Sequence, residues 1–296
     1  MDKTIIGVSL ALVSTASWAV CTLILKKLGE KLDPIAMTTI KAFWGFLYLL
    51  LLVLITGTNM FLPPNVIVPV LCSSLLGIAI GDSLFFASLS RLSPLVLSLI
   101  LFVGPDIFSG VFGLIFLGEN PSILAWIGIV VVLIGLGCFI FPIKEEENQE
   151  NKTSLLGVVF ALLSLVCTAY SMVIIKPVLL EYSTLTVTMY RMLFSAIVLF
   201  VFAFVSKKIF SWGDALQDKS YNLKFVATIA LATYGGFWLS LSAIKYCELV
   251  VAGTLMSLEP LFILLFMVLF CKYVPVKKEK IGAFLAVLGI VLISIG

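Results

Sequence analysis

Long apolar runs, separated by short polar turns or turns rich in glycine and proline, occupy almost the whole chain. Runs of about 20 apolar residues are typical of helices that cross a membrane. Ten such runs are found, at residues 4–25, 34–56, 66–89, 94–117, 122–141, 155–175, 184–206, 224–244, 249–271 and 277–295. The pattern therefore predicts an all-α polytopic membrane protein with ten transmembrane helices.

The two halves of the chain resemble each other across its most polar stretch, residues 142–153, which lies almost at the midpoint. A constant shift of 150 places residues 7–28 on residues 157–178, with 8 identities in 22 positions that include Ser14 with Ser164. Apolar composition inflates such a count, but the shared Gly, Ser and Lys residues are harder to explain by composition alone. An internal repeat is therefore predicted.

The repeat predicts how the chain is divided. We expect a first repeat over residues 1–143, a polar linker over residues 144–153 and a second repeat over residues 154–296. Each repeat holds five spans, and an odd number of spans forces consecutive copies into opposite orientations. The expected architecture is two inverted five-helix repeats, related by a pseudo-two-fold axis in the membrane plane.

Composition supports the membrane assignment and excludes several functions. Hydrophobic residues make up 61% of the chain and charged residues 12%, with a mean hydropathy of +1.21, which leaves too little charge for a soluble surface. The net charge of +3 implies no nucleic-acid partner. Histidine is absent and the six cysteines form no CxxC pair, so no metal or other cofactor is expected.

The loops carry their Lys and Arg residues very unequally. Fourteen lie in loops on one side of the membrane and three on the side of the two termini, which leaves Lys41 and Arg191 inside spans. Because cytoplasmic loops are enriched in Lys and Arg, both termini are predicted to lie outside the cytoplasm. A multi-pass protein of the plasma membrane, working as a monomer, is the expectation.

Five ionisable residues lie well inside spans: Lys41, Asp82, Asp106, Arg191 and Glu259. Such residues are costly in a membrane and often mark binding sites or ion pathways. The shift of 150 places Lys41 on Arg191. Both can snorkel to an interface or form buried pairs with carboxylates, Asp106 among them. Asp82 and Glu259 are too short to reach the interface from mid-span, which favours a role in binding or in proton coupling.

Two prolines interrupt spans near their middles, Pro105 in span four and Pro260 in span nine. Interrupted helices at corresponding places in two repeats indicate a central binding site, although a packing kink is the alternative. Polar and aromatic residues of neighbouring spans are candidates for the wall of that site. Those put forward as substrate-binding residues are Trp18, Thr22, Asp82, Tyr170, Trp238 and Glu259. The three aromatic residues lie too deep for an interfacial belt, so their N–H or O–H groups should need buried partners.

The order and spacing of several segments resemble the drug/metabolite transporter superfamily, in its ten-span EamA-like branch. The resemblance is carried by Gly7, Trp18 and Lys26, Ala87–Arg91, Leu117–Glu119, Ser242–Tyr246, Ser257–Pro260, and Gly282 with Gly289. It adds Ser257 to the substrate-binding candidates. The first half departs from the pattern, since Gly104 stands before Pro105 where Glu259 stands before Pro260. The second half departs too, with Cys271, Lys272 and Tyr273 in place of a Leu-Gly-Glu turn.

The resemblance implies a secondary transporter of a small polar metabolite, an amino acid or a similar compound. Export by alternating access around a mid-membrane cavity is the expected mechanism, with the bilayer and a small molecule as the partners. Without histidine, proton coupling would rest on carboxylates, and Glu259 and Asp82 are the candidates. The alternatives are an uncoupled facilitator, and a lipid-carrier flippase component or sensor.

An enzyme is not expected. An intramembrane aspartyl protease would use two aspartates on neighbouring spans, and Asp82 with Asp106 superficially fits. The expected Gly-x-Gly-Asp motif is incomplete, however, because Ala79 stands at its first position, and the chain holds no Pro-Ala-Leu segment.

Overall fold

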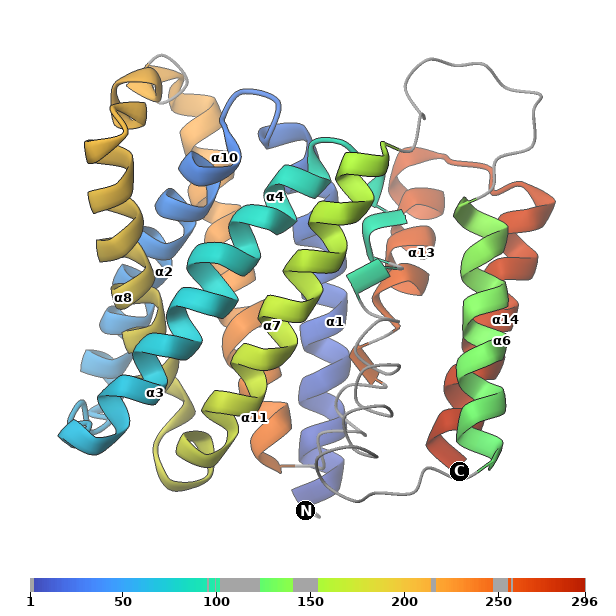
Figure 1. The fold of residues 1–296 in the computed structure, drawn as a ribbon, viewed down its shortest axis with the longest axis horizontal. Helices are drawn as coiled ribbons and strands as arrows, with labels where there is room; N and C mark the ends of the chain where they lie inside the picture. Colours follow the sequence, from blue (N-terminus) through green and yellow to red (C-terminus); the bar gives the residue numbers. More distant parts are fainter. Residues whose placement is uncertain are drawn as a thin grey trace.

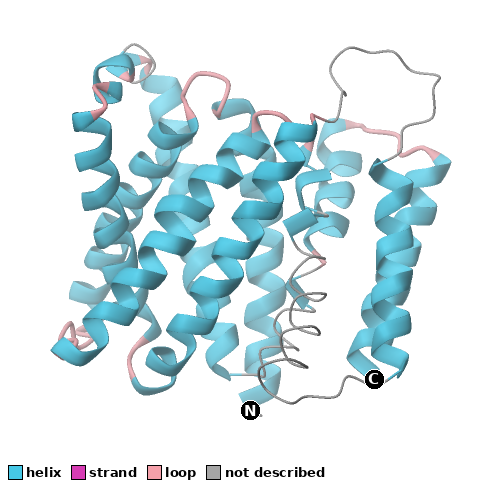
Figure 2. Ribbon diagram, in the orientation of Figure 1, coloured by secondary structure: helices cyan, strands magenta, loops and turns pink. Residues whose placement is uncertain are grey.

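The computed structural model describes residues 3–94, 96–98, 100–101, 123–140, 154–213, 217–246, 255–256 and 258–295. Every regular element in these ranges is a helix, and short loops join most of the helices (Figure 2). In the first half the helices are α1 (Lys3–Leu28), α2 (Pro34–Thr56), α3 (Pro64–Ser74), η1 (Leu75–Asp82), α4 (Ser83–Leu89) and α6 (Ile123–Ile140). In the second half they are α7 (Leu155–Glu181), α8 (Thr184–Val205), η4 (Lys208–Ser211), α10 (Lys219–Leu231), η5 (Ala232–Trp238), α11 (Leu239–Tyr246), α13 (Glu259–Cys271) and α14 (Lys277–Ile295).

Within the described ranges, six continuous helical stretches are long and apolar enough to cross a membrane: Ile5–Leu28, Pro34–Thr56, Pro64–Leu89, Leu155–Glu181, Thr184–Val205 and Lys219–Tyr246. They coincide with predicted spans one, two, three, six, seven and eight. Helices α6 and α14, which pack along each other, lie where spans five and ten are predicted. Most of span four and part of span nine fall outside the described residues, so the count of ten stays a prediction.

Helix ends follow from local sequence. Helix α2 begins where the Asp33 carboxylate accepts hydrogen bonds from the backbone N–H groups of Ile35 and Ala36, and Pro34 occupies the first turn, where its missing N–H costs nothing. The helix ends at Gly57, whose φ of 63° is left-handed and favours glycine. These end signals place Lys41 two turns into the helix.

Side-chain polarity is arranged as in a membrane protein. Apolar side chains face outward, including Leu54, Ile55 and Phe204, which are 63%, 72% and 65% exposed. Small polar side chains are buried between helices, among them Ser14, Thr39, Ser73, Ser74, Ser164 and Ser195. A lipid-facing exterior and an interior held by small polar residues are typical of transmembrane helix bundles.

The third span of each half contains a π-helical stretch at the same place in the repeat, η1 in the first half and η5 in the second. Helices α1 and α7 run in opposite directions (Figure 1), and each packs against the π-helical stretch of the other half. Ser14 on α1 donates a hydrogen bond to the Gly236 carbonyl oxygen (2.9 Å), and Ser164 on α7 donates to that of Gly81 (2.7 Å). The serines that the repeat aligns therefore make equivalent bonds in the two halves.

Glycines allow the close approach at these crossings. A Cβ atom on Gly77 would lie 2.3 Å from the Ser171 Oγ and 2.8 Å from the Ser171 Cβ, and one on Gly236 would lie 2.9 Å from the Trp18 ring. Because Cβ atoms do not approach other atoms so closely, a larger residue at either position would push the helices apart.

Replacing Gly77 by Ala is expected to destabilise the protein by about 1–3 kcal/mol, the usual cost of overpacking a tight contact. The measurement is chemical unfolding of the purified protein in mixed micelles. Gly213→Ala is the matched control, because none of the described atoms lies within 4 Å of a Cβ placed there. Equal stability of the two variants would show that α7 and η1 can separate without cost.

Polar contacts join the two halves at both edges of the bundle. At one edge the α1–α2 loop meets the segment between α8 and α10, where the Trp212 indole donates to Asp33 (2.9 Å) and Lys31 pairs with Asp218 (3.1 Å). Beside it, the Tyr221 hydroxyl in the first turn of α10 donates to the carbonyl oxygen of Leu28 at the end of α1 (2.7 Å). At the opposite edge, Thr186 near the start of α8 donates to the carbonyl oxygen of Asn59 in the α2–α3 loop (2.7 Å). Corresponding segments of the repeat thus meet at the two edges.

The Asp218 carboxylate also caps α10, which begins directly after it. The backbone N–H of Tyr221 and the Lys31 ammonium bind its charged form and hold the pKa of Asp218 below its usual value. The ion pair with Lys31 is exposed, so its strength should fall with added salt.

Candidate functional site

A buried ion pair joins α2 to η1 near the middle of the first half. The Lys41 ammonium binds the Asp82 carboxylate, and the two side chains are only 2% and 13% exposed. Three aromatic rings surround the ammonium, with the centroids of Phe237, Phe86 and Trp18 at 4.5, 5.5 and 6.0 Å from the Nζ atom. The electron-rich faces of aromatic rings attract a cation, so the rings and the Asp82 carboxylate favour the ammonium form of Lys41 at this place between both halves of the chain.

Arg191 on α8 is also buried, with 1% of its surface exposed. Its Nη2 atom donates to the Ser171 hydroxyl at 2.8 Å, and its guanidinium interacts electrostatically with Asp82. The Nε and Nη1 atoms have no hydrogen-bond partner among the described residues. Since neither Lys41 nor Arg191 reaches the surface, the snorkelling alternative is wrong for both.

Glu259 lies at the start of α13 and is 1% exposed. The Thr22 hydroxyl on α1 donates to its Oε1 atom at 3.1 Å, whereas the Oε2 atom has no partner among the described residues. Helix α13 has 13 residues and is therefore about 20 Å long, shorter than the ~30 Å hydrocarbon core. A helix of this length that ends near the membrane surface begins inside the bilayer, which places the carboxylate at depth.

Pro260 follows Glu259 in the first turn of α13. A proline there lacks an N–H that would have no intrahelical partner in any case. The sequence interpretation treated Pro260 as an interruption of span nine, with a packing kink as the alternative, and helix α13 begins at this place, at Glu259. Leu255, before the break, accepts a hydrogen bond at its carbonyl oxygen from Thr15 on α1 (3.4 Å).

The aromatic candidates divide into two groups. Trp18 and Trp238 are half-buried between the halves, and the Trp18 ring meets that of Phe237 edge-on at 4.9 Å. Tyr170 instead is 58% exposed on α7, so the expectation that its hydroxyl needs a buried partner is wrong. Three further candidates, Ser257, Asp106 and Pro105, lie outside the described residues.

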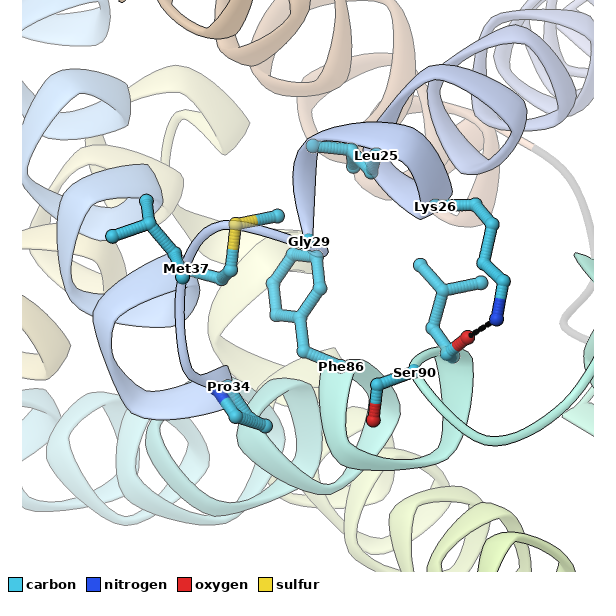
Figure 3. A pocket seen from close by; sticks show the side chains of 9 residues that line it. Leu25, Lys26, Gly29, Pro34, Met37, Phe86 and Ser90 are labelled. Atoms are coloured by element: carbon cyan, nitrogen blue, oxygen red, sulfur yellow. Dashed lines mark hydrogen bonds between the residues drawn. The ribbon is translucent and has the colours of Figure 1, made fainter. Parts of the chain in front are cut away.

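A small pocket lies beside the end of α1 that meets the α1–α2 loop (Figure 3). Its volume is about 10 Å³, enough for one water molecule and too small for a metabolite. Leu25, Met37 and Phe86 contribute apolar walls. Lys26 lies at its rim and donates hydrogen bonds to the carbonyl oxygens of Leu89 and Leu92, so the ammonium closes this end of the bundle against the end of α4.

Three residues at the buried charges were missed by the sequence interpretation: Ser171, Phe237 and Gly77. A usable signal existed for Gly77, because Gly77 and Gly81 form a small-xxx-small spacing in an apolar span, which is typical of close helix contact. No comparable signal marks Ser171 or Phe237, whose roles depend on which helices cross.

Comparison with known proteins gives a consistent result. A curated "Uncharacterized transporter" from Clostridium kluyveri (strain ATCC 8527 / DSM 555 / NBRC 12016 / NCIMB 10680 / K1) is 28% identical over 136 residues, which cover 45% of this chain and 43% of that protein. The chain thus matches less than half the length of that relative. A solved crystal structure is similar over 99% of this chain and 96% of its own, with a TM-score of 0.61 and 16% identity. At that identity the likeness shows the fold alone.

The model of the EamA-like transporter family matches the chain twice, at residues 5–141 and 155–295. The two matches lie on either side of the polar stretch at the midpoint and together cover most of the sequence. The resemblance inferred from the sequence is confirmed: this multi-pass membrane protein belongs to the EamA-like transporter family.

Proposed function

We propose that the protein is a secondary transporter of a small polar metabolite, an amino acid or a similar compound, and that it works as an exporter by alternating access. The observation that carries the proposal is the buried carboxylate of Glu259. It lies at the start of a short helix of the second half and is bonded to Thr22 of the first half. An ionisable group between two halves of a transporter is positioned to respond when the halves move.

The contacts at the two edges support alternating access. The α1–α2 loop meets the segment before α10 at one edge, and the α2–α3 loop meets α8 at the other. In a pseudo-symmetric protein the contacts at one edge can break while those at the other edge form, so that one side opens as the other closes. The conformation described here is closed beside Lys26, where the pocket is too small for a substrate.

Proton coupling is assigned to Glu259, with Asp82 as the second candidate. Asp82 is already engaged by Lys41, whereas the Oε2 atom of Glu259 is free of hydrogen bonds among the described residues. A buried carboxylate is costly unless it is paired, so Glu259 can gain a proton when sealed from water and release it when exposed.

The proposal extends to the arrangement in the cell. We propose a monomer in the plasma membrane with both termini outside, composed of repeats over residues 1–143 and 154–296 joined by residues 144–153. The unequal distribution of Lys and Arg between the loops supports this orientation.

The test is flux through the purified full-length protein in liposomes loaded with a mixture of labelled amino acids. Export of at least one amino acid is expected, together with increased tolerance of toxic amino-acid analogues in cells that overproduce the protein. Flux that ignores an imposed pH gradient would identify a facilitator instead. The folded protein could instead move a labelled lipid carrier and show no metabolite flux. That result would contradict metabolite transport and identify the protein as a lipid-carrier flippase component.

A further inference from the structure

The two cations that the repeat aligns have unequal surroundings. Lys41 and Arg191 are both buried, and each lies two turns into the second helix of its half. The π-helical stretch of the first half ends at Asp82, which binds Lys41. The corresponding stretch of the second half ends at Trp238. The equivalent serine bonds align Gly81 with Gly236, so Phe237 stands where Asp82 does in the first half. The repeat therefore supplies a carboxylate for the lysine and an apolar ring at the matching position for the arginine, and η5 contains no acidic residue.

Asp82 does not compensate for this difference. It interacts electrostatically with Arg191, but its hydrogen bond goes to Lys41. Among the described residues, two buried cations thus share one carboxylate at this place, which leaves one excess positive charge there, while Glu259 is bonded to Thr22. A guanidinium keeps its charge in proteins and carries five N–H donors, so it cannot relieve the imbalance by losing a proton.

The guanidinium is nevertheless held in a defined position. The Ser171 hydroxyl accepts a bond from its Nη2 atom and donates to the Ser73 carbonyl oxygen at 2.8 Å. Gly77 leaves the space that the head group occupies, because a Cβ there would lie 2.9 Å from the Nη2 atom. The backbone of Arg191 is held as well, because the Ser74 hydroxyl donates to its carbonyl oxygen at 2.6 Å. The side chain is fixed by its neighbours while its Nε and Nη1 atoms keep free donors among the described residues.

We infer that Arg191 binds the carboxylate of the transported molecule, and hence that the substrates are small metabolites bearing a carboxylate group. This inference rests on the proposed transport function and adds the chemical class of the substrate. A planar guanidinium matches a carboxylate in geometry and charge, and such bonds are stronger than neutral ones. The bound carboxylate would neutralise the excess charge and satisfy the free donors.

The experiment measures binding by the purified full-length protein, through the thermal shift that each probe produces. The probes are three matched sets, each an acid, its amide and its decarboxylated amine: serine, serinamide and ethanolamine; leucine, leucinamide and isopentylamine; phenylalanine, phenylalaninamide and phenethylamine. At least one acid should bind the native protein about tenfold or more tighter than its amide, the ratio expected from a hydrogen-bonded charge. The corresponding amine should bind as weakly as the amide.

Two variants assign the preference to Arg191. Arg191→Gln should lower the acid-to-amide ratio of affinities to about one. Arg191→Lys keeps the positive charge but lacks the planar set of N–H donors, so it should give an intermediate ratio. Lys224→Gln is the control, because it removes an equal charge from an exposed position on α10 and should leave the ratio unchanged. If Arg191→Gln does not fold, the acid-to-amide ratio of affinities measured for Arg191→Lys tests the inference alone.

Two results would overturn the inference: no acid binds the native protein better than its amide, or the preference survives in both Arg191 variants. Arg191 would then serve only to hold Ser171 and α7. Neither result bears on the proposed function, which is judged separately by flux of any polar metabolite through the native protein.

Discussion

Glu259→Gln is expected to abolish substrate accumulation driven by a pH gradient while leaving downhill flux. If one proton accompanies each neutral substrate, a gradient of one pH unit supplies about 1.4 kcal/mol and sustains a concentration ratio of about ten. Gln keeps the size and polarity of the side chain and can still accept the bond from Thr22, but it cannot ionise. The ratio sustained by the variant should therefore be about one.

The measurement is uptake or release of labelled substrate by liposomes with and without an imposed gradient. Glu181→Gln is the matched control, since Glu181 is exposed at the end of α7 and its loss should leave accumulation unchanged. If Glu259→Gln retains full accumulation, Glu259 is not the coupling residue and its bond to Thr22 serves only to hold α13 against α1. The same measurement on Asp82→Asn would then examine the second candidate.

The helices and the repeat were predictable because lipid imposes simple rules. Apolar runs of the right length must be helical, since backbone groups have no other partner in hydrocarbon. The predicted bounds of span two, residues 34–56, are those of α2, whose ends lie at the Asp33 cap and at Gly57. The alignment of Ser14 with Ser164 also had a structural meaning, because both serines bond to π-helical carbonyl groups of the other half.

The partners of the buried charges were not predictable. The sequence identified Lys41, Asp82, Arg191 and Glu259 as ionisable residues in spans, but pairing depends on which helices cross and at what height. Aligned positions suggested equal roles for Lys41 and Arg191, whereas both cations approach η1 of the first half. That asymmetry follows from a single acid, Asp82, which the second half lacks at the matching end of η5.

The π-helical stretches and the orientation of side chains around each helix could not be predicted from the sequence either. A π-helical stretch differs from an α-helix by one residue per turn, and a span surrounded by lipid and protein is apolar on most sides. Hydrophobic periodicity therefore did not reveal η1 or η5. Tyr170 shows the same limit: depth along a span was readable from the sequence, but the face of α7 that carries the residue was not.

Asp82→Asn is expected to destabilise the protein by about 3–5 kcal/mol, because it leaves the Lys41 ammonium buried without its counter-ion. The rings of Phe237, Phe86 and Trp18 attract the cation but cannot replace a carboxylate. The measurement is chemical unfolding in mixed micelles at neutral pH. Asp218→Asn is the control, because the Lys31–Asp218 pair is exposed and its loss should change stability far less.

The double variant Lys41→Met, Asp82→Asn distinguishes a stranded charge from a lost contact. Methionine has nearly the length of lysine and suits the aromatic surroundings, so the double variant should recover most of the stability that Asp82→Asn alone loses. Recovery of this kind is expected when the cost of a single change is mainly the uncompensated charge. If the double variant is as unstable as the single one, the carboxylate stabilises η1 by some other contact, and the ion pair is not what joins α2 to the π-helical stretch.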